Sequence, residues 1–210
     1  MPYRAVIFDL GGVVFPSPFE AFDAYDRGND LEPGTVRTLI RTSSESGAWA
    51  ALERGELSLD EFVDAIEAEA FAAGFRLDAR ALMGRIGTAL GARPEMTRAI
   101  ERIRSSGLRT AALTNNWADE EPRSTPNGLH EAGLFDVIVE SAVEGLRKPD
   151  PRIYALALAR LDVLASETVF LDDLGMNLKP AREMGMATIK VVDTDVALAE
   201  LEATLGFILR

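Results

Sequence analysis

Two apolar runs in this chain end on aspartate, the first at Asp9 and the second at Asp172, which Asp173 follows directly. A buried strand gains nothing from a carboxylate at its tip, and adjacent carboxylates repel each other. If the two runs are neighbouring strands of one parallel sheet, the three carboxylates meet at one edge. Such a cluster is stable only around a cation, and Mg²⁺ prefers carboxylate and water oxygens. The pattern therefore predicts a magnesium site.

Asp9 has a second candidate role as a nucleophile. A carboxylate can attack phosphorus to give an aspartyl-phosphate, which divides one difficult displacement into two easier ones. Gly11 and Gly12 follow Asp9. Glycines let the backbone approach a ligand closely, and exposed N–H groups there can hold phosphate oxygens. The alternative interpretation is an ordinary turn-forming aspartate at the end of a strand.

Further polar residues follow other predicted strands. Thr114, Asn115 and Asn116 end one of them, where they can hydrogen-bond phosphoryl oxygens, and Trp117 comes close enough behind to line a pocket. Lys148 lies in a loop before a helix and can neutralise charge on a phosphoryl group and on the nucleophile. Each residue taken singly has an alternative, because Thr and Asn are common in turns and most lysines are solvated.

Alternating strands and helices in the C-terminal part must position these groups. Such alternation predicts an α/β fold, a Rossmann-like doubly wound parallel sheet whose ligand site lies beyond the carboxyl ends of the strands. The expected strands cover 3–9, 110–114, 137–139, 168–172 and 187–192, and the expected helices cover 94–105, 151–161, 177–184 and 195–205.

Residues 17–91 have a different character and predict a helical insertion. Apolar residues recur there at helical spacing, and Ser58 followed by Glu61 forms a capping-box pattern. The sheet domain is then expected to comprise residues 1–16 and 92–210.

Composition narrows the classes of partner. The chain of 210 residues has a net charge of -12, which argues against nucleic acid and anionic membrane and requires any phosphate site to be locally positive. It has no cysteine and no apolar run of the roughly 20 residues that span a membrane. We expect a cytoplasmic protein without a signal peptide, either monomeric or dimeric.

Its single histidine, His130, is expected at the surface or at a helix cap rather than in a catalytic triad.

These motifs, in this order, resemble the haloacid dehalogenase-like (HAD) hydrolase superfamily over the whole chain. More specific segments resemble the phosphatase-like N-terminal domain of soluble epoxide hydrolase and the related domain of acyl-CoA dehydrogenase fusion proteins. The superfamily motifs lie at 9–13, 113–116, 148–149 and 170–173, and the more specific segments at 135–141, 148–154 and 172–182.

The resemblance implies a role for each candidate. The insertion would be the α-helical cap that shapes substrate selectivity. Thr114, Asn115 and Lys148 would hold the phosphoryl group. Asp9 would be both nucleophile and metal ligand. The other ligands would be the carbonyl of Gly11 and the carboxylate of Asp173, with Asp172 just behind them near Lys148.

Gly11 departs from the superfamily pattern. Phosphatases of this superfamily usually carry there a second aspartate that protonates the leaving group and activates water, a contribution of about 10²–10⁴-fold. Either the substrate has a good leaving group, such as an acyl or aryl phosphate, or another acid serves, for which Asp23, Asp119 and Glu120 are candidates.

The resulting hypothesis is a Mg²⁺-dependent phosphatase acting on a small phosphorylated metabolite. Two alternatives stay open. One is a non-catalytic binding module on the same fold, which Gly11 favours. The other is a metal-independent 2-haloacid dehalogenase, which needs no proton donor because halide leaves unprotonated.

Overall fold

The computed structural model describes residues 3–42, 46–87, 91–117 and 133–210 of the chain. Its centre is a sheet with strand order β3-β2-β1-β4-β5, in which every pairing is parallel. The strands are β1 (Ala5–Phe8), β2 (Arg109–Thr114), β3 (Val137–Glu140), β4 (Thr168–Asp172) and β5 (Ala187–Lys190). The predicted doubly wound sheet is confirmed.

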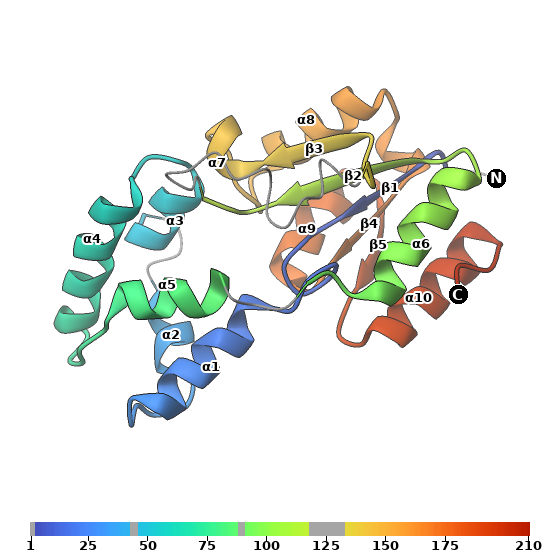
Figure 1. The fold of residues 1–210 in the computed structure, drawn as a ribbon. Coiled ribbons are helices and arrows are strands. Elements are labelled where there is room, and N and C mark those ends of the chain that lie inside the picture. The colour runs from blue at the N-terminus through green and yellow to red at the C-terminus, as the bar shows by residue number, and fades with distance from the viewer. Residues whose placement is uncertain (1–2, 43–45, 88–90, 118–132) are drawn as a thin grey trace.

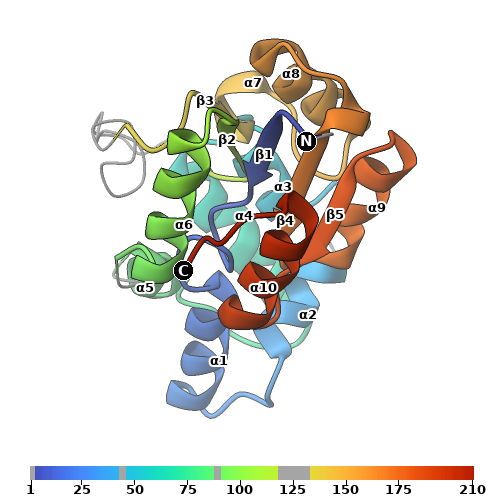
Figure 2. The ribbon, with the colours of Figure 1, turned by 90° about the vertical axis from the view of Figure 1, so that its right-hand side faces the viewer.

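Helices cover both faces of the sheet (Figures 1 and 2). One face packs against α6 (Pro94–Ser105) and α10 (Thr194–Leu205), and the other against α8 (Pro151–Leu161) and α9 (Gly175–Glu183). Side chains of β1 alternate between the two cores, with Val6 and Phe8 on the first face and Ala5 and Ile7 on the second. Burial on both faces explains why this strand is apolar throughout.

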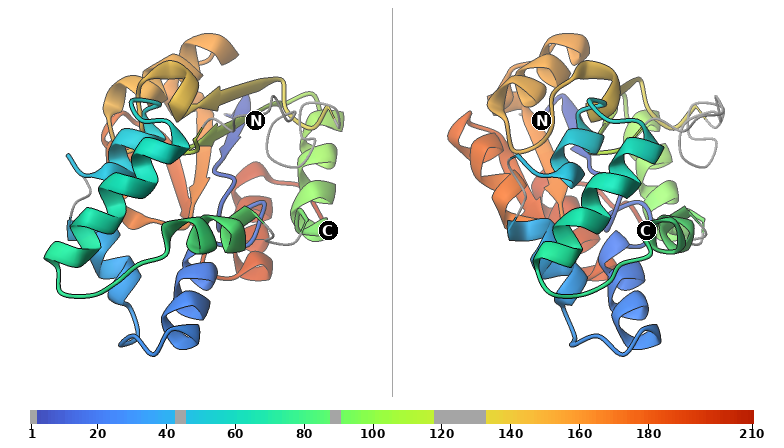
Figure 3. Two further views of the ribbon diagram at one scale, coloured as in Figure 1. Left: turned by 60° about the vertical axis from the view of Figure 1, so that its left-hand side comes forward. Right: turned by 90° about the vertical axis from the view of Figure 1, so that its left-hand side faces the viewer.

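A separate group of helices lies between β1 and α6 in the sequence and carries its own hydrophobic core. Figure 3 shows these helices, coloured blue to green, gathered at one end of the molecule, and in Figure 1 the arrowheads of β2 and β3 point toward them. They are α1 (Pro18–Gly28), α2 (Thr35–Thr42), α3 (Ala48–Glu53), α4 (Leu59–Ala72) and α5 (Ala79–Gly87). We refer to them as the cap helices.

Local capping fixes where several helices begin. The Ser58 hydroxyl accepts from the Glu61 N–H, while the Glu61 carboxylate accepts from the Ser58 N–H at 2.9 Å, so the predicted capping box starts α4. The Asp150 side chain accepts the Arg152 N–H and caps α8, with proline at the first helical position. A short helix, α7 (Ser141–Glu144), follows β3 directly, and a 3₁₀ turn (Ala165–Glu167) precedes β4.

Candidate active site

The register of β1 and β4 brings the three predicted carboxylates together. Phe8 pairs with Leu171, and the Asp9 N–H donates to the Leu171 carbonyl at 2.9 Å. The residues that follow therefore leave the sheet side by side. One carboxylate oxygen from each of Asp9, Asp172 and Asp173 lies within 4.8 Å of the other two. That spacing leaves room for one ion among the three side chains.

Lys148 links two of the three carboxylates. Its Nζ lies 2.7 Å from Asp9 Oδ1 and 2.8 Å from Asp172 Oδ2, and its side chain is only 1% exposed. Burial alone would lower the pKa of Lys148, but Asp172 and Asp9 together raise it above its ordinary value. The ammonium therefore stays charged and contributes a fixed positive charge at the edge of the sheet.

The electrostatics of the cluster favour a divalent cation. Three carboxylates around one ammonium leave an excess of two negative charges. Burial raises the pKa of Asp9 well above its usual range, with Lys148 opposing the shift and Asp172 adding to it. Burial and then Asp172 raise the pKa of Asp173 to about 6. Ionising these carboxylates in the absence of a cation costs electrostatic free energy. A cation bound among them would reduce their mutual repulsion and displace their protons.

Asp172 is held by donors from the protein itself. It accepts Lys148 Nζ, the N–H of Leu174 at 2.8 Å, and Asn177 Nδ2, which lies 3.1 Å from each carboxylate oxygen. Tyr154 in turn donates its hydroxyl to the Asn177 carbonyl at 2.8 Å. Both oxygens of Asp172 are engaged, which suits a residue that orients Lys148 rather than one that binds an ion directly.

Asp173 faces the loop after β1. Gly12 has a φ of +79°, and a Cβ at this position would overlap the Asp173 carboxylate. Only glycine combines this backbone conformation with that close approach. Ser17, the N-cap of α1, also points its hydroxyl at Asp173, with 3.5 Å between Oγ and Oδ2. Sequence patterns had indicated Gly12 but not Ser17, whose position before Pro18 marks it only as a helix cap.

The residues at the end of β2 and just after it divide into two groups. Asn115 joins the site, because its amide donates to the Lys148 carbonyl at 3.1 Å and accepts the Lys148 N–H at 2.8 Å. Thr114 is buried at the tip of the strand. Asn116 turns away, donating to Glu140 at 2.7 Å, and Trp117 packs edge-on against Trp49 with ring centroids 6.0 Å apart.

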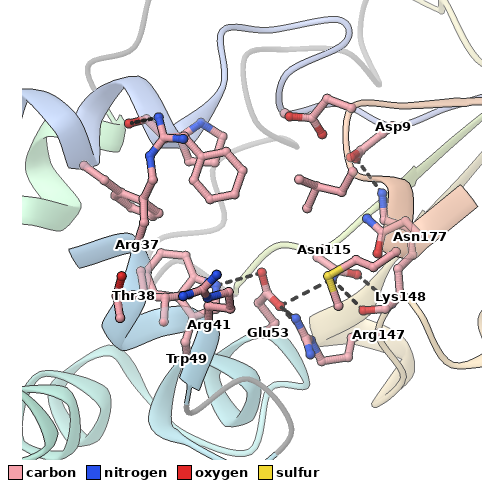
Figure 4. A pocket seen from close by; sticks show the side chains of 18 of the residues that line it. Asp9, Arg37, Thr38, Arg41, Trp49, Glu53, Asn115, Arg147, Lys148 and Asn177 are labelled. Carbon is pink, nitrogen blue, oxygen red and sulfur yellow. Dashed lines mark hydrogen bonds and ion pairs between the residues drawn. The ribbon is translucent and has the colours of Figure 1, made fainter. Parts of the chain in front are cut away.

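A cavity of about 580 Å³ opens from Asp9 toward the cap helices (Figure 4). Asp9, Gly11, Asn115, Lys148 and Asp173 form its sheet side. Thr114, Gly12, Asn116 and Trp117 are not among the described residues that line it. The cap side is mostly apolar, with basic residues interspersed, and comprises Pro18, Phe19, Phe22, Gly34, Arg37, Thr38, Ile40, Arg41, Trp49 and Glu53.

Glu53 from α3 is a residue that the sequence patterns did not single out. It is 7% exposed, and its carboxylate accepts Trp49 Nε1 at 2.9 Å, Arg147 Nε at 2.7 Å and Asn115 Nδ2 at 3.3 Å. Through Glu53, the cap helices are therefore linked by an ion pair to the loop that carries Lys148 and by a hydrogen bond to the tip of β2. Apart from Asp9 and Asp173, Glu53 is the only carboxylate among the described residues lining the cavity.

The sequence suggested other acids that could replace an aspartate at position 11 as proton donor. They either do not line the described cavity or lie outside the described residues. Asp23 forms an ion pair with Arg37 at 2.6 Å and is not among the described lining residues. Asp119 and Glu120 lie outside the described residues, as does His130.

We expect Glu53→Ala to lower the free energy of unfolding by about 2–4 kcal/mol, since it leaves the Arg147 guanidinium, 15% exposed, without its carboxylate. Chemical denaturation measures this change. Glu56→Ala is the matched control, because Glu56 also pairs with an arginine of the cap, Arg54, but is 53% exposed. That pair should contribute less than about 1 kcal/mol. Equal costs for the two variants would contradict the proposed tie between cap and sheet domain.

Comparison with known proteins identifies the family. A sequence profile of haloacid dehalogenase-like hydrolases matches residues 3–185. The chain belongs to this family of enzymes. The superfamily resemblance inferred from the motifs is thus confirmed, and the parallel sheet carries the HAD fold.

Individual relatives agree with the more specific resemblance. The chain is 40% identical to mouse acyl-CoA dehydrogenase family member 10 and 35% identical to pig bifunctional epoxide hydrolase 2, each over 98% of its length. It spans only 19% and 39% of those two proteins. It is 30% identical to a sesquiterpene phosphatase of Aspergillus oryzae, covering 97% of each chain.

A solved structure shows the same fold. A HAD family enzyme of Bacteroides thetaiotaomicron, crystallised in complex with magnesium and inorganic phosphate, superposes with a TM-score of 0.60 at 19% identity, covering 90% of this chain and 93% of that one. In the described part of this HAD hydrolase, no helix is both long and apolar enough to cross a membrane.

Proposed function

We propose that this HAD hydrolase is a Mg²⁺-dependent phosphomonoesterase that works through an aspartyl-phosphate on Asp9. The observation that carries the proposal is the cluster itself, in which three carboxylates lie within 4.8 Å of one another and one of them, Asp9, stands 2.7 Å from a buried ammonium. Its relative named as a sesquiterpene phosphatase supports phosphate ester chemistry, with a small phosphorylated molecule as substrate.

The donor set fits magnesium. Side-chain oxygens of Asp9 and Asp173 and the backbone carbonyl of Gly11 are hard oxygen ligands, and Mg²⁺ takes one or two carboxylates and completes its shell with water and phosphate oxygens. When bound, the ion supplies charge neutralisation for the phosphoryl oxygens. Asp172 holds Lys148 in place behind these ligands through the 2.8 Å ion pair.

The residues of the chain divide the chemistry between them. A carboxylate oxygen of Asp9 attacks phosphorus, forming a new P–O bond as the bond to the leaving oxygen breaks. Lys148, with Asn115 at the tip of β2, holds the phosphoryl group in line and offsets its charge, while Thr114, buried beside Asn115, supports it without lining the cavity. Water then attacks the phosphorus of the aspartyl-phosphate, which releases inorganic phosphate and restores Asp9.

Gly11 limits which esters react fast. No side chain at this position protonates the leaving oxygen. Esters whose leaving groups are stable as anions should therefore react fastest at this site. We therefore expect acetyl phosphate and aryl phosphates to react faster than simple alkyl phosphates.

The two alternatives predict different behaviour. A metal-independent dehalogenase would bring an anionic haloacid toward three carboxylates with one ammonium, an unfavourable arrangement. Chloride release from 2-chloropropionate in the presence of EDTA would establish it. A binding module, which Gly11 favours, would bind Mg²⁺ and phosphate without turning over any ester.

The direct test is turnover of p-nitrophenyl phosphate and acetyl phosphate with Mg²⁺ and after its removal by EDTA. We expect phosphate release with magnesium, loss of activity with EDTA, and recovery when Mg²⁺ is added back. Equal rates with and without the metal would contradict the proposal, as would the absence of turnover on both esters.

A further inference from the structure

The cavity is much larger than a phosphate group needs. Its volume of about 580 Å³ falls in the range that accommodates a whole drug-sized ligand. In the proposed phosphatase the phosphoryl end of the substrate would occupy only the sheet side, near Asp9 and Lys148. The remainder extends to the cap helices, so the rest of the substrate is expected to lie against them.

The middle of the cavity is apolar and aromatic. Phe22 stands between Phe19 and Trp49 in edge-to-face contacts, with ring centroids 5.6 Å and 5.4 Å apart. All three rings line the cavity. Rings packed in this way are fixed in place. Phe22 and Trp49 are only 1% and 5% exposed, so the partly buried Phe19 presents most of the apolar surface, which suits a hydrocarbon or aromatic segment rather than a polyhydroxylated one.

The far wall is different because it is basic. Arg37, Thr38 and Arg41 line the cavity from α2, and the two arginines are four residues apart, on one face of the helix. Figure 4 shows Arg37, Thr38 and Arg41 across the cavity from Asp9. Asp23 pairs with Arg37 and offsets one of the two positive charges, so the wall retains a net charge of about +1.

The Arg37 guanidinium also has a hydrogen-bond donor that its neighbours in the described structure do not use. Its Nη2 donates to Asp23 at 2.6 Å and to the Phe19 carbonyl at 3.3 Å, and its guanidinium lies 4.7 Å from the centre of the Phe19 ring. Its Nε is buried and has no hydrogen-bond partner among the described residues. An unpaired buried donor costs free energy. Because Nε has almost no accessible surface while the Arg37 side chain is 42% exposed, an incoming oxyanion meets the outer guanidinium nitrogens first and reaches Nε only if the side chain shifts.

The other cationic side chains that line the cavity, those outside α2, already form ion pairs with carboxylates. Lys148 is shared between Asp9 and Asp172, and Arg147 donates to Glu53 through both Nε and Nη2. In a chain with a net charge of -12, a second anionic group on a ligand would be repelled unless a local cation received it. On the cap side, α2 provides that cation.

We infer that the substrate carries a second oxyanion, a carboxylate or another phosphate, at the end opposite the scissile phosphate, with an apolar segment between the two. Arg37 and Arg41 receive the second oxyanion, and the ring of Phe19, supported by those of Phe22 and Trp49, contacts the apolar segment. This inference rests on the proposed phosphatase function of the same site.

The test uses alkyl phosphates of graded chain length in three forms, ending in a methyl group, a carboxylate or a second phosphate. Binding is measured by calorimetry with the Asp9→Asn variant in the presence of Mg²⁺, so that no ligand is consumed. At the best chain length we expect the carboxylate or the bisphosphate to bind at least about tenfold more tightly than the methyl-terminated ligand. Whichever of the two binds more tightly identifies the oxyanion.

Two variants and a control localise the effect. Arg41→Gln removes a charge, and Arg37→Lys keeps the charge but removes the Nε–H. In each, the affinity ratio between oxyanion- and methyl-terminated ligands should fall toward one. Arg27→Gln, in the last turn of α1, is exposed and away from the described cavity lining, and should keep the ratio of the parent chain. Circular dichroism verifies that each variant is folded.

The outcomes separate this inference from the proposed function. A ratio near one at every chain length overturns the second oxyanion, and so does a high ratio that survives both arginine variants. The phosphatase proposal stands in either case if the unsubstituted chain hydrolyses p-nitrophenyl phosphate. If none of the ligands binds and no ester is hydrolysed, both proposals fail.

Discussion

Asp9→Asn should abolish phosphate release from p-nitrophenyl phosphate and acetyl phosphate, leaving less than about one thousandth of the parent rate. The amide cannot act as a nucleophile toward phosphorus, and the site loses a carboxylate that sits 2.7 Å from Lys148. The fold should survive, because Lys148 keeps its 2.8 Å ion pair with Asp172. Steady-state kinetics with Mg²⁺ measure the loss.

Asp162→Asn is the matched control for this substitution. Asp162 is exposed at the end of α8 with a φ of +52°, a conformation that asparagine also adopts readily. It should turn over both esters like the parent chain. Phosphate release by Asp9→Asn at the parent rate would rule out the aspartyl-phosphate.

Gly11→Asp should raise the rate on alkyl phosphates by about 10²-fold, since it installs a general acid two residues after the nucleophile. Gly11 lines the cavity, and a Cβ there meets only Pro18 Cδ, at 3.3 Å, so a small adjustment of the loop accommodates the side chain. The gain should be smaller on p-nitrophenyl phosphate, whose leaving group needs a proton least. Comparing kcat on the two classes of ester tests this.

Gly11→Asn separates acidity from size in that experiment. It adds the same volume at the same position but cannot donate a proton in the same way. We expect no comparable gain from it. An equal gain from Asn and Asp would assign the effect to loop geometry, and no gain from either would indicate that another residue already supplies the proton.

The part of the site built by strand ends could be predicted from the sequence. In a parallel sheet the carboxyl ends of adjacent strands meet, so apolar runs ending at Asp9 and Asp172 predict proximity once the fold class is known. Capping chemistry is equally local, and Ser58 and Asp150 begin helices as their neighbours indicate. In these cases a few consecutive residues carry the whole physical cause.

The contribution of the cap could not be predicted in this way. Glu53 reaches Arg147 and Asn115 only because the cap helices pack against the sheet domain, and no sequence interval encodes that contact. Trp117 shows the same limit. Its nearness to Asn115 in the chain suggested a pocket wall; its ring packs against Trp49, which lines the cavity, while Trp117 is not itself among the described lining residues.

The aspartyl-phosphate on Asp9 can be tested directly by a structure of crystals soaked with Mg²⁺ and beryllium fluoride, a mimic of the phosphoryl group. We expect BeF₃⁻ on a carboxylate oxygen of Asp9, with Mg²⁺ at roughly 2.1 Å from oxygens of Asp9, Asp173 and the Gly11 carbonyl. A fluoride adduct elsewhere, or magnesium bound away from these three residues, would contradict it.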